Sequence, residues 1–561
     1  METRPLASSD PPATVRWPAA ALLWAVVFLG AAAATWQLWE QDVFWQVRAG
    51  RELWATGSWP RADTWSYTAV GGPWRNFQWL STLLMAAADG LGGIAGLILL
   101  RDVGVAAVLL LTLISLHRRG SQAFAAMALT GLVWLACARR FQVRSDLFVM
   151  AIFAAVFFVE SSSLSWRARR IALVGLVVLA ANLHPGTAPF VQLAALVVVA
   201  RDRRREQRGW RHEILAVAAI FLGLLLTPYH LHVVPYLWRH LFYQAYQAVP
   251  NPDHRSLALA HFLPREGGLG PMAWLVLVLA AAIGLGREMR SRQAVVREGV
   301  ALLLLVVLVG MSVNRDRVMP YAALFAASIV GGLFSTWALS RGPLAARVAV
   351  AAGIWLVAIP LWLSRPEVRF GLGLNAHLHP VGAARFIARY RPQRQVLHFQ
   401  GDGNYLLRAL PDYPVFLDTR ESMYDHLGAT YRDMVNDPAL MSAVMGRYGV
   451  NTVLVPEAFL LAGWKPGVTR RAAFFPKREF ALVYFDDTYA LLVRRIPEHE
   501  ALIADHEYEF LLPYREPDAY LSMRDRTPER DQTFRREVER CQHEVPESHH
   551  CQAAAAALGK L

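Results

Sequence analysis

The residues whose types could do chemistry gather in a polar segment that follows the first long apolar run. Asp42 begins a stretch, residues 42–55, whose apolar residues recur at helical spacing, and Glu40 lies just before it. A carboxylate partly withdrawn from water is a stronger base and can take a proton from a hydroxyl group. Asp42 is the first candidate for such a base and Glu40 the second. A carboxylate at a helix start can equally cap the helix by accepting backbone N–H bonds, so position alone leaves both roles of Asp42 open.

Arginines near the ends of other apolar runs could bind a phosphate group, because a guanidinium matches phosphate oxygens with paired hydrogen bonds. The alternative is that they lie at the membrane interface and pair with lipid headgroups. His184, with Asn182 close by in sequence, is either a site residue or a packed core histidine. The candidate arginines are Arg48, Arg144, Arg315 and Arg317.

Two further carboxylates are candidates for substrate binding. Asp63 is a second site carboxylate or the end of a turn. Asp102 follows Arg101 inside an apolar run, where an ionised group costs about 2.5–3.5 kcal/mol. Adjacent residues point in different directions on a helix, so we expect Arg101 and Asp102 to have separate partners.

The elements that must position these residues are mostly membrane-spanning helices. The chain has 561 residues, of which 55% are hydrophobic and 18% charged. This composition is too apolar for a soluble protein of that length and excludes a disordered chain. Long apolar runs fill residues 17–363, and we expect about eleven spans, since some 20 apolar residues cross a bilayer as a helix. They lie near residues 17–38, 94–116, 121–138, 146–163, 171–183, 187–200, 213–229, 272–286, 299–313, 319–338 and 345–363. Residues 78–92 are apolar but short, and are expected to lie at the interface.

The arginine-rich breaks between the apolar runs predict the orientation of the spans. Arg201, Arg203, Arg204, Arg205, Arg208 and Arg211 form the strongest such break and should be cytoplasmic. Residues 1–16 are then cytoplasmic, and the chain beyond residue 364 lies outside. A cleavable signal peptide is the alternative for the first span, which is long for one. The net charge of +13 therefore reports topology, and the sequence has no P-loop or basic groove that would indicate nucleic acid.

Several short motifs lie where this topology places the outer face. Asp42 follows the first span, and Trp45 and Gly50 lie in the 42–55 helix, which we expect to end at Gly57. Pro60, Pro73-Trp74 and Gln78-Trp79-Leu80 come after it. The arrangement resembles the C-type (GT-C) glycosyltransferases, and in particular a bacterial branch with a soluble C-terminal domain. The segments 182–186 (Asn-Leu-His-Pro-Gly), 314–317 (Asn-Arg-Asp-Arg) and 415–420 (Val-Phe-Leu-Asp-Thr-Arg) fit that branch. Relatives carry Arg-Pro where this chain has Arg144-Ser145, and His-Gly where it has His184-Pro185.

The resemblance implies a fold, a reaction and a location. It implies a transferase in the bacterial inner membrane that moves a sugar from a polyprenyl-phosphate donor to an envelope acceptor on the periplasmic face. Asp42 would be the base, and Arg144 and Arg317 would hold the phosphate. The alternative is a non-catalytic scaffold of envelope polysaccharide assembly with the same fold. A transporter is disfavoured, because no internal repeat or paired broken spans are seen.

No cofactor follows from the sequence, although a divalent metal stays open. The loop 227–271 carries His230, His232, Asp253 and His254, which could bind a metal, but their spacing matches no known ligand set. A lid or an acceptor-recognition loop is the other interpretation.

The C-terminal part reads as a soluble sequence. Residues 376–496 alternate helix and strand patterns, which predicts a small periplasmic α/β domain over residues 364–496. Strands are expected at 395–399, 415–417, 452–455, 481–485 and 489–493, and a helical stretch at 422–448. Asp418 and Arg420 follow the strand 415–417, a usual place for a ligand, or form an internal ion pair at a turn.

Residues 497–561 predict a charged helical tail. Cys541 and Cys551 lie in it, outside the cytoplasm if the orientation holds, so we expect a disulfide between them. Cys137 lies in a span and is expected to be an ordinary small apolar residue.

Overall fold

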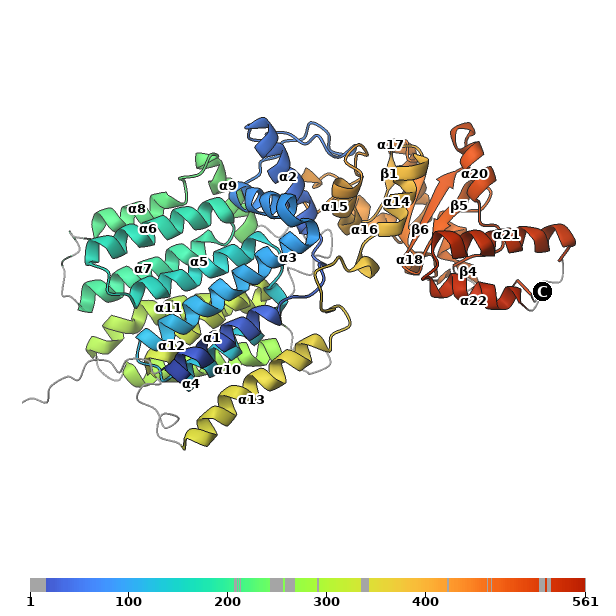
Figure 1. Ribbon diagram of the computed structural model, residues 1–561. Helices are drawn as coiled ribbons and strands as arrows, with labels where there is room; N and C mark the ends of the chain where they lie inside the picture. The colour runs from blue at the N-terminus through green and yellow to red at the C-terminus, as the bar shows by residue number, and fades with distance from the viewer. Residues whose placement is uncertain are drawn as a thin grey trace, which may run out of the picture.

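The protein consists of a helical bundle followed by a mixed sheet with flanking helices. A computed structural model describes residues 17–205, 213–242, 268–289, 292–333, 343–420, 423–513 (except 462 and 466) and 526–559, with residues 209, 211, 256–257 and 520–521. Figure 1 shows the bundle, coloured blue to yellow, on one side, and the C-terminal unit, coloured orange to red, on the other. Helix α2 lies where the two meet.

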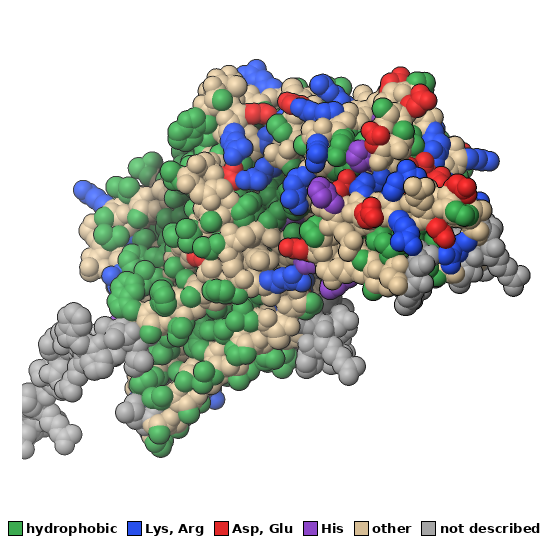
Figure 2. Space-filling model, turned by 45° about the vertical axis from the view of Figure 1, so that its right-hand side comes forward, with side chains coloured by type: hydrophobic (Ala, Val, Ile, Leu, Met, Phe, Trp, Pro, Cys, Tyr) green, Lys and Arg blue, Asp and Glu red, His purple; other side chains and the backbone are tan. Residues whose placement is uncertain are grey.

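The bundle is that of a polytopic membrane protein. Among the described helices, those long and apolar enough to cross a bilayer are Trp79–Arg118, Ala123–Arg140, Leu269–Glu288 and Ala345–Leu363. Large apolar side chains such as Leu303, Val306 and Leu356 are exposed on its outer helices, and Figure 2 shows mostly apolar side chains over the bundle and mixed charges over the C-terminal unit. The count of about eleven spans and their orientation stay predictions.

The described helices of the bundle lie at each predicted apolar range. They are α1 (Trp17–Ala32), α3 (Trp79–Arg118), α4 (Ala123–Cys137), α5 (Ser145–Glu160), α6 (Trp166–Leu183), α7 (Ala188–Arg205), α8 (Ile214–Gly223), α9 (Val233–Phe242), α10 (Leu269–Glu288), α11 (Arg292–Asn314), α12 (Met319–Leu333) and α13 (Leu344–Leu363).

Helix α2 (Asp42–Thr56) and the first part of α3 form the end of the bundle that carries the site. Gly57 ends α2 in the left-handed conformation, at φ 63°, as its position after the apolar pattern predicted. Non-helical angles at Gly92 and Gly93 divide α3 into two helical parts. The first part packs directly on α2. The two helices are so close that a Cβ on Gly50 would collide with the carbonyl oxygen of Thr82.

Arg101 and Asp102 each have a partner of their own, as predicted. Arg101 donates to the carbonyl of Trp36 at 2.6 Å, and Asp102 accepts from the hydroxyl of Thr35 at 2.8 Å. The two side chains also meet each other at 3.5 Å. Both therefore hold the same extended segment after α1, because that segment crosses α3 at their level.

The C-terminal unit is built on a four-stranded sheet in the order β1-β2-β6-β5. Strand β1 (Val396–Leu397) runs parallel to β2 (Thr452–Pro456), and β6 (Tyr489–Arg494) runs antiparallel to β2 and β5 (Phe480–Phe485). All of β5 is buried, which explains its unbroken apolar run. The other elements are α14 (Val381–Tyr390), α15 (Gln400–Ala409), α16 (Gly428–Met434), α17 (Pro438–Tyr448), α18 (Glu457–Leu461), β3 (Gly463–Lys465), β4 (Val468–Thr469), α19 (Arg470–Phe474), α20 (Glu500–His506), α21 (Pro528–Glu544) and α22 (His549–Leu558).

Two predicted elements of this unit are wrong. Residues 415–417 do not join the sheet. Val415 instead forms a single bridge to Ser66, which lies in residues 39–93, the segment predicted as the first outer loop. The helical stretch 422–448 is divided into α16 and α17. Asp437 breaks it, since its carboxylate accepts the backbone N–H groups of Ala439 and Leu440 and caps α17.

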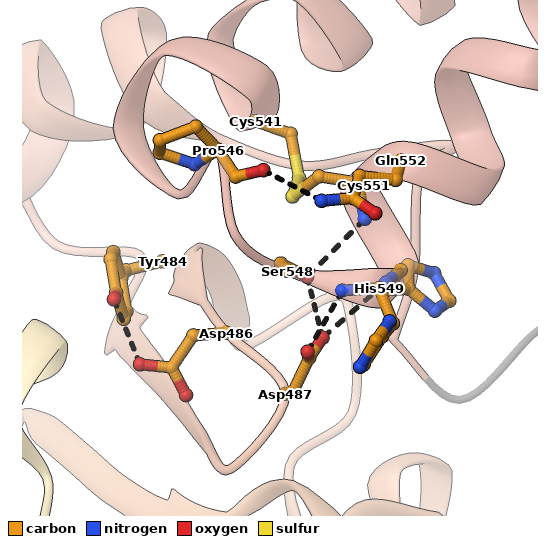
Figure 3. The surroundings of a disulfide bond; sticks show 10 residues. Tyr484, Asp486, Asp487, Cys541, Pro546, Ser548, His549, Cys551 and Gln552 are labelled. Atoms are coloured by element: carbon orange, nitrogen blue, oxygen red, sulfur yellow. Dashed lines mark hydrogen bonds between the residues drawn. A yellow bond between two sulfur atoms is a disulfide. The ribbon is translucent and has the colours of Figure 1, made fainter. Parts of the chain in front are cut away.

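A disulfide joins Cys541 of α21 to Cys551 of α22 (Figure 3). Beside it, Asp487 accepts hydrogen bonds from the hydroxyl of Ser548 at 2.5 Å and from the backbone N–H of His549 at 2.8 Å. The tail helices are thus fixed both to each other and to the turn between β5 and β6. Cys137 is a free, buried thiol.

Candidate active site

A cavity of about 860 Å³ lies where the bundle meets the C-terminal unit. The bundle contributes the start of α2, the loops 73–78 and 139–146, His184, α9 and the turn Asp316–Val318. The C-terminal unit contributes Leu378, Gln400, Gly401, Thr419 and Arg420. Seven arginines and four acidic residues line it, so the wall as a whole is positive and suits an anionic ligand.

Asp42 lies in this cavity with each carboxylate oxygen held by a different partner. Arg144 donates to Oδ2 at 2.5 Å, and the hydroxyl of Thr419 donates to Oδ1 at 2.5 Å. Among the described contacts, no backbone N–H of α2 donates to this carboxylate, so the structure does not place Asp42 as a helix cap. Its side chain is 18% exposed, which leaves it open to the cavity.

Arg144 directly precedes α5 and connects two carboxylates of the first outer loop. It lies 3.6 Å from Glu40 as well as beside Asp42. A second arginine–carboxylate pair lies nearby in the sequence, where Arg140 contacts Asp146 at 3.2 Å. The backbone of Arg144 is extended, so it separates the turn at residues 139–143 from the start of α5. This local conformation allows both arginine–carboxylate pairs.

His184 and Arg317 continue the cavity wall away from Asp42, and Arg317 keeps it positive there. His184 follows α6, and burial, together with Arg317 and Arg144, lowers its pKa against the opposing effect of Asp146. Arg317 meets the ring of His240 at 2.5 Å. Gly186 makes this packing feasible, because a Cβ there would lie about 2.5 Å from the same ring.

Arg420 forms the other end of the cavity and is locked in place. It binds Asp418 at 2.6 Å and Asp63 at 2.8 Å, and it lies over the rings of Trp65 and Trp74. Asp63 and Asp418 are fully buried behind it and do not line the cavity. They therefore orient Arg420 rather than contact a ligand. This buried cluster also ties the first outer loop to the C-terminal unit.

Three candidates lie away from the cavity wall. Arg48 pairs with Glu52 at 3.1 Å and lies over the ring of Trp65. Asp102 belongs to the cluster that holds the segment after α1. Arg315 donates to the carbonyl oxygen of His240 at 2.6 Å, and so supports the wall from behind.

Sequence reasoning missed Thr419, Arg140, Asp146 and His240. Arg140 and Asp146 flank Arg144, and their helix-start spacing was the signal that could have found them. Thr419 lies between Asp418 and Arg420, both of which were candidates. Its contact with Asp42 joins residues 377 positions apart, so no local pattern could have announced it.

The carboxylates near the cavity do not fit a metal site in the described structure. Among the described residues, no three His, Cys, Asp or Glu side chains come together closely enough to hold an ion. Asp42, Glu40 and Asp146 each meet an arginine instead. Asp253 and His254, which were candidates in the loop 227–271, lie outside the described residues.

Comparison with known proteins places the fold. No protein-family model and no curated protein matches the sequence. An oligosaccharyltransferase from Archaeoglobus fulgidus, solved with a tethered acceptor peptide, has a TM-score of 0.53 at 12% identity over 84% of this chain and 73% of its own. The ArnT protein of Cupriavidus metallidurans in its apo state has a TM-score of 0.49 at 14% identity over 84% of this chain and 97% of its own. The same ArnT bound to undecaprenyl phosphate has a TM-score of 0.46 at 16% identity, over 85% and 97%.

The chain therefore has the GT-C fold, as the sequence resemblance predicted. At these identities the likeness describes the architecture of the chain. The reaction has to come from the residues in the cavity.

Proposed function

We propose that this protein is a membrane glycosyltransferase that moves a sugar from a polyprenyl-phosphate donor to a cell-envelope acceptor. The observation that carries the proposal is the placement of Asp42 in a positive cavity at the junction of the two halves. A base and a phosphate-binding wall are the two requirements of this reaction, and the GT-C fold supports both roles. The bilayer and the lipid-linked donor are the expected partners.

In the proposed reaction Asp42 takes the proton from an acceptor hydroxyl. The oxygen attacks the anomeric carbon of the sugar as the bond from that carbon to the phosphate oxygen breaks, and polyprenyl phosphate leaves. Arg144, Arg140 and Arg317 lie where guanidinium groups can hold the negative charge of the leaving phosphate. The phosphate would compete with Asp42 and Glu40 for Arg144, so donor binding would release the base for its task.

The protein is proposed to lie in the bacterial inner membrane, with its N-terminus in the cytoplasm and the C-terminal unit in the periplasm. The cavity would then open on the periplasmic side, where envelope acceptors are found. The arginine-rich segment at the end of α7 supports this orientation.

The proposal is tested by complementation. A strain lacking the gene receives wild-type protein, the Asp42→Asn variant or the control Asp433→Asn, whose side chain is 57% exposed and pairs with neighbouring Arg432. We expect the wild type and the control to restore an envelope glycan that the deletion lacks. If Asp42→Asn restores that glycan fully, Asp42 is not the base, and a non-catalytic scaffold explains the protein better.

A further inference from the structure

The contact between Thr419 and Asp42 links the C-terminal unit to the proposed base. The hydroxyl of Thr419 lies 2.5 Å from Oδ1 of Asp42. Arg144, on the bundle side, donates to Oδ2. Each half of the molecule therefore orients one of the two oxygens of the Asp42 carboxylate.

The direction of this hydrogen bond is determined by Asn404 of α15. The side-chain Nδ2 of Asn404 donates to the hydroxyl oxygen of Thr419 at 2.9 Å. A hydroxyl that accepts one hydrogen here has its own hydrogen free to donate, and Asp42 is the acceptor in reach. Asn404 cannot turn over freely, because its Oδ1 accepts the backbone N–H of Thr419 at 3.3 Å and its side chain is fully buried.

The backbone that carries Thr419 is anchored on both sides. A Cβ on Gly403 would collide with the carbonyl oxygen of Leu417, so glycine at this position lets α15 approach the segment. Arg420, the next residue, is clamped by Asp418 and Asp63. The hydroxyl of Thr419 thus has little freedom to leave Asp42.

We propose that Thr419 is a positioning residue for the base, set by Asn404, so that the C-terminal unit completes the active site of the bundle. The inference rests on the proposed role of Asp42. Thr419 keeps its proton throughout. It holds the carboxylate in one orientation, while Asp42 takes the proton from the acceptor.

Three variants of the full-length protein test the inference. Thr419→Val removes the hydroxyl at nearly constant volume, and Thr419→Ser keeps it. Thr452→Val is the matched control, because Thr452 is also buried in the C-terminal unit and donates its hydroxyl to a carbonyl, that of Gln393 at 3.1 Å. Membranes of the deletion strain, radiolabelled in their lipid-linked sugars, supply donor and acceptor to each purified protein.

We expect Thr419→Val to lower kcat about tenfold, a loss of one hydrogen bond to a charged group, and to leave KM for the donor within about twofold. Thr419→Ser should restore the rate, because it keeps the hydroxyl.

The inference is overturned if Thr419→Val matches Thr452→Val in rate. It is also overturned if Thr419→Ser is as slow as Thr419→Val, or if KM for the donor rises along with the fall in kcat, since either result marks a merely structural role. A wild-type protein that transfers no label would refute the proposed function instead, so the two failures are distinguishable.

Discussion

At the scale of residues, the proposed active site depends on which carboxylates stay open to the cavity and which are locked. Asp42 retains access, whereas Asp63 and Asp418 are fully buried around Arg420. All of these aspartates meet an arginine, so the pairing alone does not separate catalytic from structural roles. Exposure to the cavity separates these three, because Asp42 lines the cavity wall with its arginines and Asp63 and Asp418 do not.

Asp402 on α15 is a buried carboxylate with a different consequence. Burial raises its pKa to about 7, although the hydroxyl of Tyr489 donates to it at 2.6 Å. Because the folded pKa exceeds the unfolded value, the folded state binds more protons between about pH 4 and 7, and stability falls as the pH rises through that window. The loss of stability is complete above about pH 7, where Asp402 is ionised in the folded state as well.

The variant Asp402→Asn keeps an acceptor for Tyr489 and removes the titration. We expect its gain in the free energy of unfolding to be about 2–3 kcal/mol larger at pH 8 than at pH 5. Thermal unfolding in detergent at the two pH values measures this, with the exposed Asp433→Asn as control. An equal gain at both pH values would show that the carboxyl group of Asp402 has an ordinary pKa.

At the scale of elements, close packing of α2 on α3 places Asp42 at the cavity. Gly50 lies at the crossing, with no room for a Cβ between it and Thr82. We expect Gly50→Ala to lower the free energy of unfolding by about 1–3 kcal/mol, as overpacking does, and to reduce transfer because α2 must move. Gly446→Ala is the matched control, since Gly446 lies in α17 with open space around it. There alanine should stabilise by about 0.5–1 kcal/mol. Thermal unfolding measures both variants, and a stabilised Gly50→Ala would contradict the close packing.

Local patterns predicted the helix 42–55 and its end at Gly57, because helical spacing and a left-handed C-cap are encoded within a few residues. They failed at 415–417, where an apolar run looked like a strand. That segment instead bridges to Ser66, a partner far away in sequence. The same holds for the site, since Asp42 and Arg144 were candidates and Thr419 was missed, because their contacts depend on the packing of both halves. Long-range contacts of this kind leave no periodic signal.

At the scale of the whole molecule, the first outer loop joins the bundle to the C-terminal unit. The backbone N–H of Val415 donates to the carbonyl of Trp65 at 2.9 Å, and Tyr67 N–H donates to the carbonyl of Val415 at 3.1 Å. The unit is therefore part of the site and has to lie on the same side of the membrane as Asp42.

The arginine-rich breaks, together with the shared side of Asp42 and the C-terminal unit, predict the topology of the chain. Alkaline phosphatase is active only when exported, so fusions after residues 250 and 400 should be active and a fusion after residue 205 inactive. Enzyme activity in whole cells, normalised to fusion-protein level, measures this. An inactive fusion after residue 400 would place the C-terminal unit in the cytoplasm and would remove the expected oxidising surroundings of Cys541 and Cys551.

The decisive experiment measures the initial rate of sugar transfer by purified Asp42→Asn. In the radiolabelled membranes of the deletion strain, we expect a rate at least about a hundredfold below wild type, the usual effect of losing a general base. Asp433→Asn should transfer at the wild-type rate. A rate for Asp42→Asn within about twofold of wild type would contradict the assignment of Asp42 as the base.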